Sequence, residues 1–166
     1  MGDLAGELAL HHRAAFGWAL VCCRWDRAAA EDVLQSSYLR VMDGEAAFNG
    51  TASFRTFLFG VIRRTASEER RRRAVRATVP LSLLSAAAEP MTADEGLAPI
   101  IRTESSRRLI AALGQLAPRQ REVLHLVFYN DLTIAEAAVV IGVSLGSART
   151  HYERGKAHLR RLLGEE

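Results

Sequence analysis

The sequence predicts an all-α protein made of two small helical domains joined by a flexible linker, the C-terminal domain being a helix-turn-helix. Apolar residues recur three and four positions apart through most of the 166-residue chain, which is the spacing of one helix face. No stretch alternates apolar and polar residues as a strand would. Between the two helical regions lies a segment with three prolines and no sustained periodicity, which is typical of a linker.

The N-terminal domain, residues 1–76, is predicted to contain three helices. The first begins near Leu4 and ends near Cys23, the second covers about 28–42, and the third begins near Ser53 after a loop with an Asn-Gly turn signal. The third helix carries an apolar stripe made of Phe54, Phe57, Leu58, Val61, Ile62 and Thr65. Beyond this stripe we expect an arginine-rich, solvated extension.

Charge divides the chain into the same parts. The net charge is +3, and 21 of the 22 Lys and Arg residues are Arg. Residues 63–76 carry a local charge of +5 and residues 145–161 one of +4, whereas residues 77–106 carry −3. Guanidinium groups suit phosphates and base edges. Two basic domains separated by an acidic linker, residues 77–104, therefore favour a nucleic-acid partner.

The C-terminal domain, residues 105–166, ends in a short helix, a turn and a longer helix. Thr133 and Glu136 form the capping box of the short helix, which Gly142 ends. Ser144 then caps the longer helix. This succession is typical of a helix-turn-helix.

Phasing the longer helix at about 100° per residue separates an inward from an outward side. The inward side holds Leu145, Ala148, Tyr152, Leu159 and Leu163. The outward side holds Ser147, Thr150, Arg154 and Arg161, with Arg149 on its flank. Such a helix offers hydrogen-bonding side chains to a DNA groove and cations to the phosphates beside it. The pattern therefore favours duplex binding over a merely solvated amphipathic helix.

The loop and third helix of the N-terminal domain interleave aromatic and cationic residues. These are Phe48, Phe54, Arg55, Phe57, Phe59, Arg63 and Arg64. Aromatic faces stack on unpaired bases and arginines follow the backbone, which is the chemistry of single-strand binding. A structural role stays open for Phe54 and Phe57, because both also belong to the apolar stripe.

Several classes of protein are excluded. No run of about 18 apolar residues could span a membrane, and the acidic start of the chain does not form a signal peptide. Cys22 and Cys23 are neighbours, so they support neither a disulfide framework nor a zinc site and indicate a reducing cytoplasm. The histidines lack partners at ligand spacing, and no nucleophile–base pair occurs. We expect no metal, no cofactor and no enzymatic activity.

Three blocks in this order resemble bacterial RNA polymerase sigma factors of the extracytoplasmic-function (ECF) group. They read AEDVLQSSYLRV at 30–41, SFRTFLFGVIRR at 53–64 and LAPRQREVLHLVFYNDLTIAEAAVVIGVSLGSARTHYERGKAHLRRLL at 116–163. The resemblance implies sigma region 2 for residues 1–76, a linker for 77–104 and sigma region 4 for 105–166. It also implies a role in promoter recognition and strand opening.

The resemblance implies a role for each surface. Core RNA polymerase would bind Asp32, Gln35, Ser36, Tyr38 and Leu39. The minus-ten element, as a melted non-template strand, would contact Phe48, Asn49, Gly50, Ser53, Arg55, Thr56, Arg63 and Arg64. The minus-thirty-five element, as duplex DNA, would contact Ser147, Arg149, Thr150, His151 and Arg154.

The implied partners are core RNA polymerase, promoter DNA in duplex and melted form, and an anti-sigma factor that occludes one or both domains. The resemblance implies a cytoplasmic protein, associated with the nucleoid when bound to polymerase, without membrane insertion. The sequence departs from the family pattern at four places. Ser36 stands where an acidic residue is usual, Phe57 where Trp is usual, and Arg64 where Asn is frequent. In the recognition helix, Arg149-Thr150-His151 stands where Lys-Ser-Arg is frequent.

Two alternatives remain at this point. One is a two-domain transcriptional regulator of the response-regulator kind, whose output domain also resembles residues 116–158. The N-terminal half disfavours it, because that half has no alternating strand–helix pattern and no acidic phosphorylation pocket. The other is a sigma-like protein that only binds a regulatory partner and directs no transcription.

Overall fold

The computed structural model describes residues 3–77 and 103–164, and within these ranges the chain forms seven α-helices and no strand. The N-terminal half consists of α1 (Leu4–Cys22), α2 (Arg27–Met42) and α3 (Phe54–Ala77). The C-terminal half consists of α5 (Glu104–Gln115), α6 (Pro118–Asn130), α7 (Ile134–Ile141) and α8 (Leu145–Leu163). The all-α class is confirmed. Most of the predicted linker, residues 78–102, lies outside the described ranges.

Polar side chains fix where α2 and α7 begin, and the sequence predicted the cap of α7 but not that of α2. The Asp26 carboxylate accepts a hydrogen bond from the Ala29 amide at the start of α2, at 2.9 Å. Thr133 and Glu136 form the complete capping box of α7, each side chain accepting from the other residue's amide. Gly142 ends α7 at φ +69°, a left-handed conformation that glycine adopts without a steric cost.

The core of the N-terminal half is built around Trp18 and Phe59, both 0% exposed. Their rings stack with centroids 6.2 Å apart, and the Trp18 indole N–H donates to the Phe59 carbonyl at 3.0 Å. The pattern of aromatic and cationic residues in the sequence predicts that Phe59 stacks on bases. That interpretation is wrong for Phe59, because its ring is enclosed between α1 and α3.

The C-terminal half places α8 directly against α6 through a glycine. A Cβ atom at Gly155 would lie only 3.1 Å from Leu124 Cδ1 and 3.2 Å from Gln120 Cβ. Ala148 on the same side is also buried, as predicted. Leu145, predicted to face inward, is instead 40% exposed, because it is the first residue of α8 and precedes the contact with α6.

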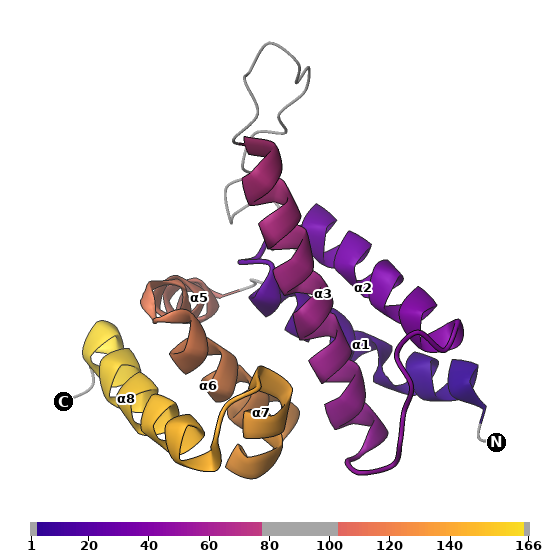
Figure 1. The fold of residues 1–166 in the computed structure, drawn as a ribbon. Helices are drawn as coiled ribbons and strands as arrows, with labels where there is room; N and C mark the ends of the chain where they lie inside the picture. The colour runs from indigo at the N-terminus through magenta and orange to yellow at the C-terminus, as the bar shows by residue number, and fades with distance from the viewer. Residues whose placement is uncertain (1–2, 78–102, 165–166) are drawn as a thin grey trace.

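The two halves pack against each other along a buried seam. In Figure 1, α3 runs between the other N-terminal helices on one side and α6 and α7 on the other. α1 packs on α6 and α3 packs on α7, so apolar residues of both halves join in one continuous core. Val123 of α6 and Ile141 of α7 are completely enclosed there. The halves are therefore in extensive contact and are not two bodies held only by a linker.

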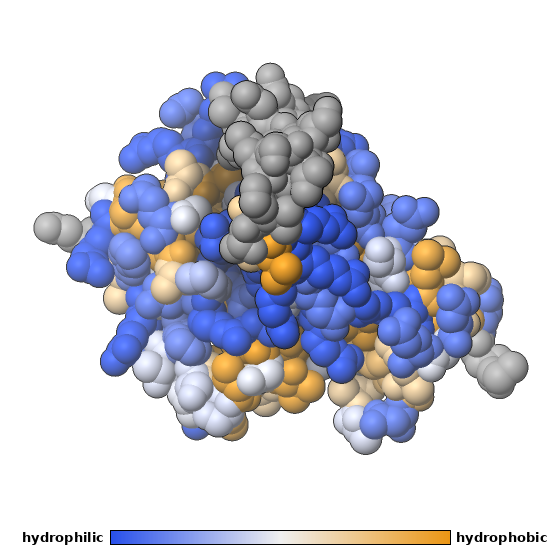
Figure 2. Space-filling view, turned by 45° about the horizontal axis from the view of Figure 1, so that its top comes forward, coloured by the Kyte–Doolittle hydropathy of each residue, from blue (hydrophilic) through white to orange (hydrophobic). Residues whose placement is uncertain are grey.

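The C-terminal end of α3 presents a hydrophilic face. Figure 2 looks toward this end and shows hydrophilic side chains crowded around and below the grey segment. Residues 70–77 are all exposed, including the Arg70–Arg73 run. The predicted arginine-rich extension is confirmed as a continuation of the same helix. Among residues 3–77 and 103–164, no helix combines the length and apolarity needed to cross a membrane.

Candidate nucleic-acid interface

The structure brings most of the predicted duplex-DNA face to the surface of α8. Ser147, Arg149, Thr150 and Arg154 are exposed, and His151 is half-buried. The Thr150 hydroxyl donates to the Gly146 carbonyl at 3.1 Å, so it can accept but not donate a hydrogen bond toward a ligand. The arrangement leaves two guanidinium groups and two hydroxyls on one outer surface of a capped helix.

Aromatic and aliphatic contacts hold this helix in place from behind. The Tyr152 ring stacks on Phe128 of α6 at 5.8 Å between centroids. The Lys156 ammonium lies 4.5 Å from the centroid of the Tyr152 ring, within the range of a cation–π interaction. The stacking of Tyr152 on Phe128 and the close approach at Gly155 fix the orientation of α8 relative to α6.

A groove between α1 and α2 contains much of the surface predicted to bind polymerase. Its volume is about 450 Å³, and its walls include Gln35, Tyr38 and Leu39. The Tyr38 hydroxyl lies 3.1 Å from His12 Nδ1, and burial raises the pKa of Tyr38 to about 12. Leu39 is 53% exposed, although it is a large apolar residue. Asp32 is exposed and Ser36 half-buried on the same helix, and neither lines the groove.

The loop before α3 is ordered by its own side chains. Asn49 Oδ1 accepts hydrogen bonds from the Thr51 amide at 3.1 Å and the Thr51 hydroxyl at 2.7 Å. Its side-chain NH₂ group stays available. The Phe48 ring contacts Phe57 at 5.3 Å between centroids and is still 45% exposed. The Ser53 and Thr56 hydroxyls lie 2.9 Å apart, and Thr56 is only 1% exposed.

The predicted single-strand surface faces the other half of the molecule. A cavity of about 420 Å³ is walled on one side by residues of this surface and on the other by α7. The walls from the predicted set are Phe48, Asn49, Thr56, Arg63 and Arg64, and those from α7 and the turn after it are Val139, Val140 and Gly142. In this arrangement α7 and the turn after it form the wall opposite these residues.

One carboxylate joins the two halves across this seam. Arg63 Nε donates to Glu122 Oε1 and Arg119 donates to Glu122 Oε2, both at 3.2 Å. The Glu122 side chain is 6% exposed and that of Arg63 15%. Burial raises the pKa of Glu122, while Arg63 opposes the shift. Sequence reasoning did not identify Glu122, because its partner lies 59 residues away and on another helix.

Comparison with known proteins assigns the chain to a family. A family model described as sigma-70 region 2 matches residues 9–76, and one described as sigma-70 region 4 matches residues 106–159. The ECF RNA polymerase sigma factor SigL of Mycobacterium tuberculosis is 32% identical, over 99% of this chain and 94% of SigL. The chain belongs to the ECF group of RNA polymerase sigma factors.

This ECF sigma factor has relatives in other bacteria. SigX of Bacillus subtilis is 30% identical over 85% of this chain and 75% of SigX. CarQ of Myxococcus xanthus is 32% identical over 83% of this chain and 76% of CarQ. As a sigma factor, the protein binds core RNA polymerase and recognises minus-ten and minus-thirty-five promoter elements to initiate transcription.

Two solved structures share the fold of this sigma factor. RpoE of Bartonella quintana, solved with the anti-sigma factor NepR, has a TM-score of 0.78 at 20% identity and covers 99% of this chain and 98% of its own. CnrH, solved with the cytosolic domain of CnrY, has a TM-score of 0.67 at 22% identity and covers 98% and 88%. Both comparisons support the arrangement of helices.

Proposed function

We propose that this ECF sigma factor uses three surfaces, two for promoter recognition and one for core polymerase. The outer face of α8 reads the minus-thirty-five element as duplex. The loop before α3 and the adjoining face of α3 hold the melted minus-ten strand, and the α1–α2 groove contacts core polymerase. The domain limits are those predicted above, with region 2 in residues 1–76, the linker in 77–104 and region 4 in 105–166.

The observation that carries this proposal is the outer face of α8. The face sits on a helix that is capped by Ser144 and held from behind by α6. Arg149 and Arg154 are exposed there, and within the described ranges neither belongs to an ion pair. Cations kept free on a rigid helix are suited to base edges and phosphates in a major groove.

The proposed minus-ten surface requires a change of conformation. Thr56 is buried and Arg63 is paired with Glu122. Neither side chain can therefore contact an unpaired DNA strand while α7 packs against α3. We therefore propose that α7 leaves the face of α3 when the factor engages polymerase and promoter. Polymerase can drive this change if it binds the separated halves more tightly than the packed ones.

The proposed roles extend to partners and location. We propose an anti-sigma factor as a further partner, by analogy with RpoE, which was solved with the anti-sigma factor NepR. The protein acts in the cytoplasm, at the nucleoid when bound to polymerase, and performs no bond chemistry of its own. Co-purification of the tagged chain from its native host tests for that partner.

The assignment of α8 is tested by transcription with core polymerase on a genomic promoter library, followed by an Arg154→Ala variant on the promoters found. If Arg154 reads a base, the variant loses about 1–3 kcal/mol of minus-thirty-five recognition, visible as a lower affinity that depends on that element. Arg160→Ala is the matched control, because Arg160 is exposed on the same helix and lies six residues further along, about 120° away around the helix axis. Equal transcription by Arg154→Ala and the wild type contradicts the assignment.

A further inference from the structure

Glu153 places a negative charge on an otherwise basic helix. It is the only acidic residue of α8, which also holds five Lys and Arg residues. Around the helix axis it lies about 40° from Arg149 and about 100° from Arg154, inside the sector between these two residues. Its side chain is 68% exposed. A carboxylate there repels the phosphates of any duplex, so it lowers the affinity for DNA irrespective of sequence.

The stability of the helix does not explain this carboxylate. Glu153 Oε1 lies 3.2 Å from the Lys156 ammonium, three residues further along the helix. Exposed pairs of this kind add little to the free energy of unfolding. Glu153 also lies in the middle of α8 and not in the first turn, where the helix dipole stabilises acidic side chains. The helix is instead secured by its Ser144 cap and by its close approach to α6 at Gly155.

The carboxylate is held in place with one oxygen free. The Lys156 ammonium lies 4.5 Å from the centroid of the Tyr152 ring, and this ring stacks on Phe128 of α6. The ring therefore positions the ammonium, and the ammonium positions Glu153 Oε1 in turn. In the described parts of the chain, Glu153 Oε2 has no hydrogen-bond or ion-pair partner. This oxygen is available to a donor group of a base.

The four bases differ in what they offer a carboxylate in a major groove. Guanine and thymine present oxygen acceptors and no donor, so they repel it. Adenine presents an amino group beside the acceptor N7, whereas cytosine presents its N4 amino group beside a C–H group. An ionised carboxylate can only accept hydrogen bonds. It is therefore matched best by cytosine.

We propose that Glu153 is a specificity-determining residue that selects a cytosine in the minus-thirty-five element by accepting a hydrogen bond from its N4 amino group. This role rests on the proposed function, in which the outer face of α8 reads that element as duplex. Acceptor atoms of the other bases are repelled by the carboxylate, and this repulsion excludes them. Glu153 thus lowers the affinity for DNA in general and raises the selectivity between sequences.

The test uses the full chain with core polymerase on a promoter found in the genomic library. Each position of the minus-thirty-five element is randomised, and sequencing of barcoded transcripts gives the preferred base at every position. The wild type should prefer cytosine, on one strand or the other, at one position. Glu153→Ala should reduce that preference about tenfold and leave the other positions unchanged. Glu153→Gln should move it to adenine, because a glutamine amide pairs with adenine N6 and N7.

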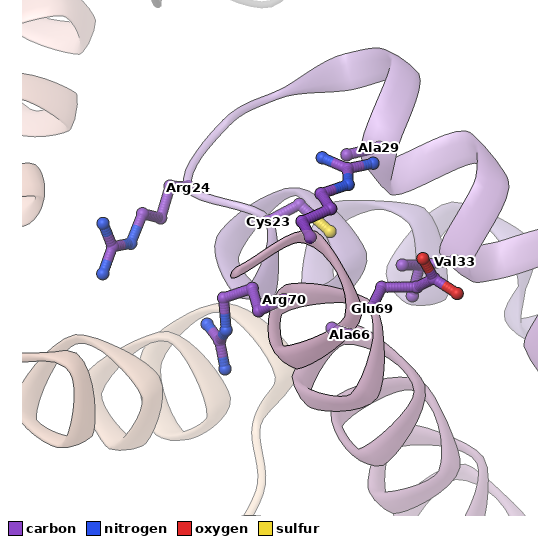
Figure 3. A pocket seen from close by; sticks show the side chains of 8 residues that line it. Cys23, Arg24, Ala29, Val33, Ala66, Glu69 and Arg70 are labelled. Carbon is purple, nitrogen blue, oxygen red and sulfur yellow. The ribbon is translucent and has the colours of Figure 1, made fainter. Parts of the chain in front are cut away.

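Glu69→Gln is the matched control. Glu69 forms an ion pair at 2.9 Å with Arg72, three residues further along α3, so this variant also removes one negative charge from a pair within a helix. Glu69 lines a pocket of about 310 Å³ walled by residues of the N-terminal half. Figure 3 shows it there, turned to the side opposite Arg24 and Arg70. Glu69→Gln should keep the base preferences of the wild type, and a change that it shares with Glu153→Gln overturns the proposal.

The outcomes separate this role from the proposed function. If Arg154→Ala impairs minus-thirty-five recognition while Glu153→Ala keeps every base preference of the wild type, Glu153 reads no base and only its role is refuted. Equal weakening of all positions in Glu153→Ala would mean that the residue holds α8 in place, which also refutes base selection. If wild-type transcription depends on no position of the element, the proposed function fails, and the role of Glu153 fails with it.

Discussion

At the scale of single residues, His125 shows how the seam depends on an uncharged ring. The imidazole stacks on Trp18 of the other half at 5.8 Å and on Tyr129 at 5.2 Å between centroids. Burial lowers the pKa of His125 from 6.5 to about 4. Protonation would place a cation in a stack between the two halves, beside a seam that is already rich in arginine.

This histidine makes the packed state sensitive to acid. The unfolded or separated chain takes up the proton first, so stability is full above about pH 6.5 and falls as the pH decreases toward about 4. For a pKa shift of this size, the free energy of unfolding falls by about 3 kcal/mol over the whole range. Denaturant unfolding of the wild type and His125→Phe between these pH values measures it, and the difference between them should shrink or reverse as the pH falls.

The comparison with the His125→Phe variant is needed because protonation of Glu122 changes the free energy of unfolding in the opposite direction. Its pKa is raised by burial, so its protonation favours the folded state as the pH falls. Comparing His125→Phe with the wild type removes this common contribution. Parallel pH profiles for the two proteins would mean that His125 does not control the effect.

At the scale of helices, Gly155 decides how closely α8 approaches α6. An added Cβ would meet Leu124, which is 2% exposed and has little room to move. Gly155→Ala should therefore lower the free energy of unfolding by about 1–2 kcal/mol, since crowding outweighs the better helix propensity of alanine. Gly17→Ala in α1 meets no atom within 4 Å and should instead be neutral or stabilising. Chemical denaturation measures both.

The helices themselves could be predicted from local patterns. The α7 capping box, the end of α7 at Gly142 and the extent of α8 all depend on neighbouring residues, and the structure confirms them. The enclosure of Phe59 and the exposure of Leu145 could not be predicted in this way, because they depend on which helix lies opposite. The same holds for Gly155, where a missing side chain gives no hydrophobic signal.

The candidate site was predictable to a similar degree. Residue types on α8 indicated its outward face, since exposure along a single helix follows from its period. The packing of the two halves beside the proposed minus-ten surface does not follow from any local pattern. This packing depends on contacts such as that between Arg63 and Glu122. The two residues are far apart in the sequence, so no local pattern shows that they meet.

At the scale of the whole molecule, the seam and the proposed promoter surfaces compete. The α8 face and the α1–α2 groove are accessible in the packed arrangement, and so are Phe48, Asn49 and Arg64 of the proposed minus-ten surface, whereas Thr56 is buried and Arg63 is paired with Glu122. Polymerase and duplex DNA can therefore be engaged before the halves separate. Strand capture then depends on the free energy needed to move α7 away from α3.

Replacing Glu122 by Lys tests this competition. The substitution puts a cation beside Arg63 and Arg119 in place of the carboxylate that accepts from both, so like charges repel at the seam. We expect a larger radius of gyration in small-angle scattering and roughly tenfold tighter binding of an unpaired minus-ten oligonucleotide, equivalent to about 1.4 kcal/mol. Glu31→Lys is the control, since its ion pair with Arg27 is exposed and exposed pairs contribute little. If Glu122→Lys stays as compact as the wild type and binds the strand no better, the seam does not restrain the minus-ten surface.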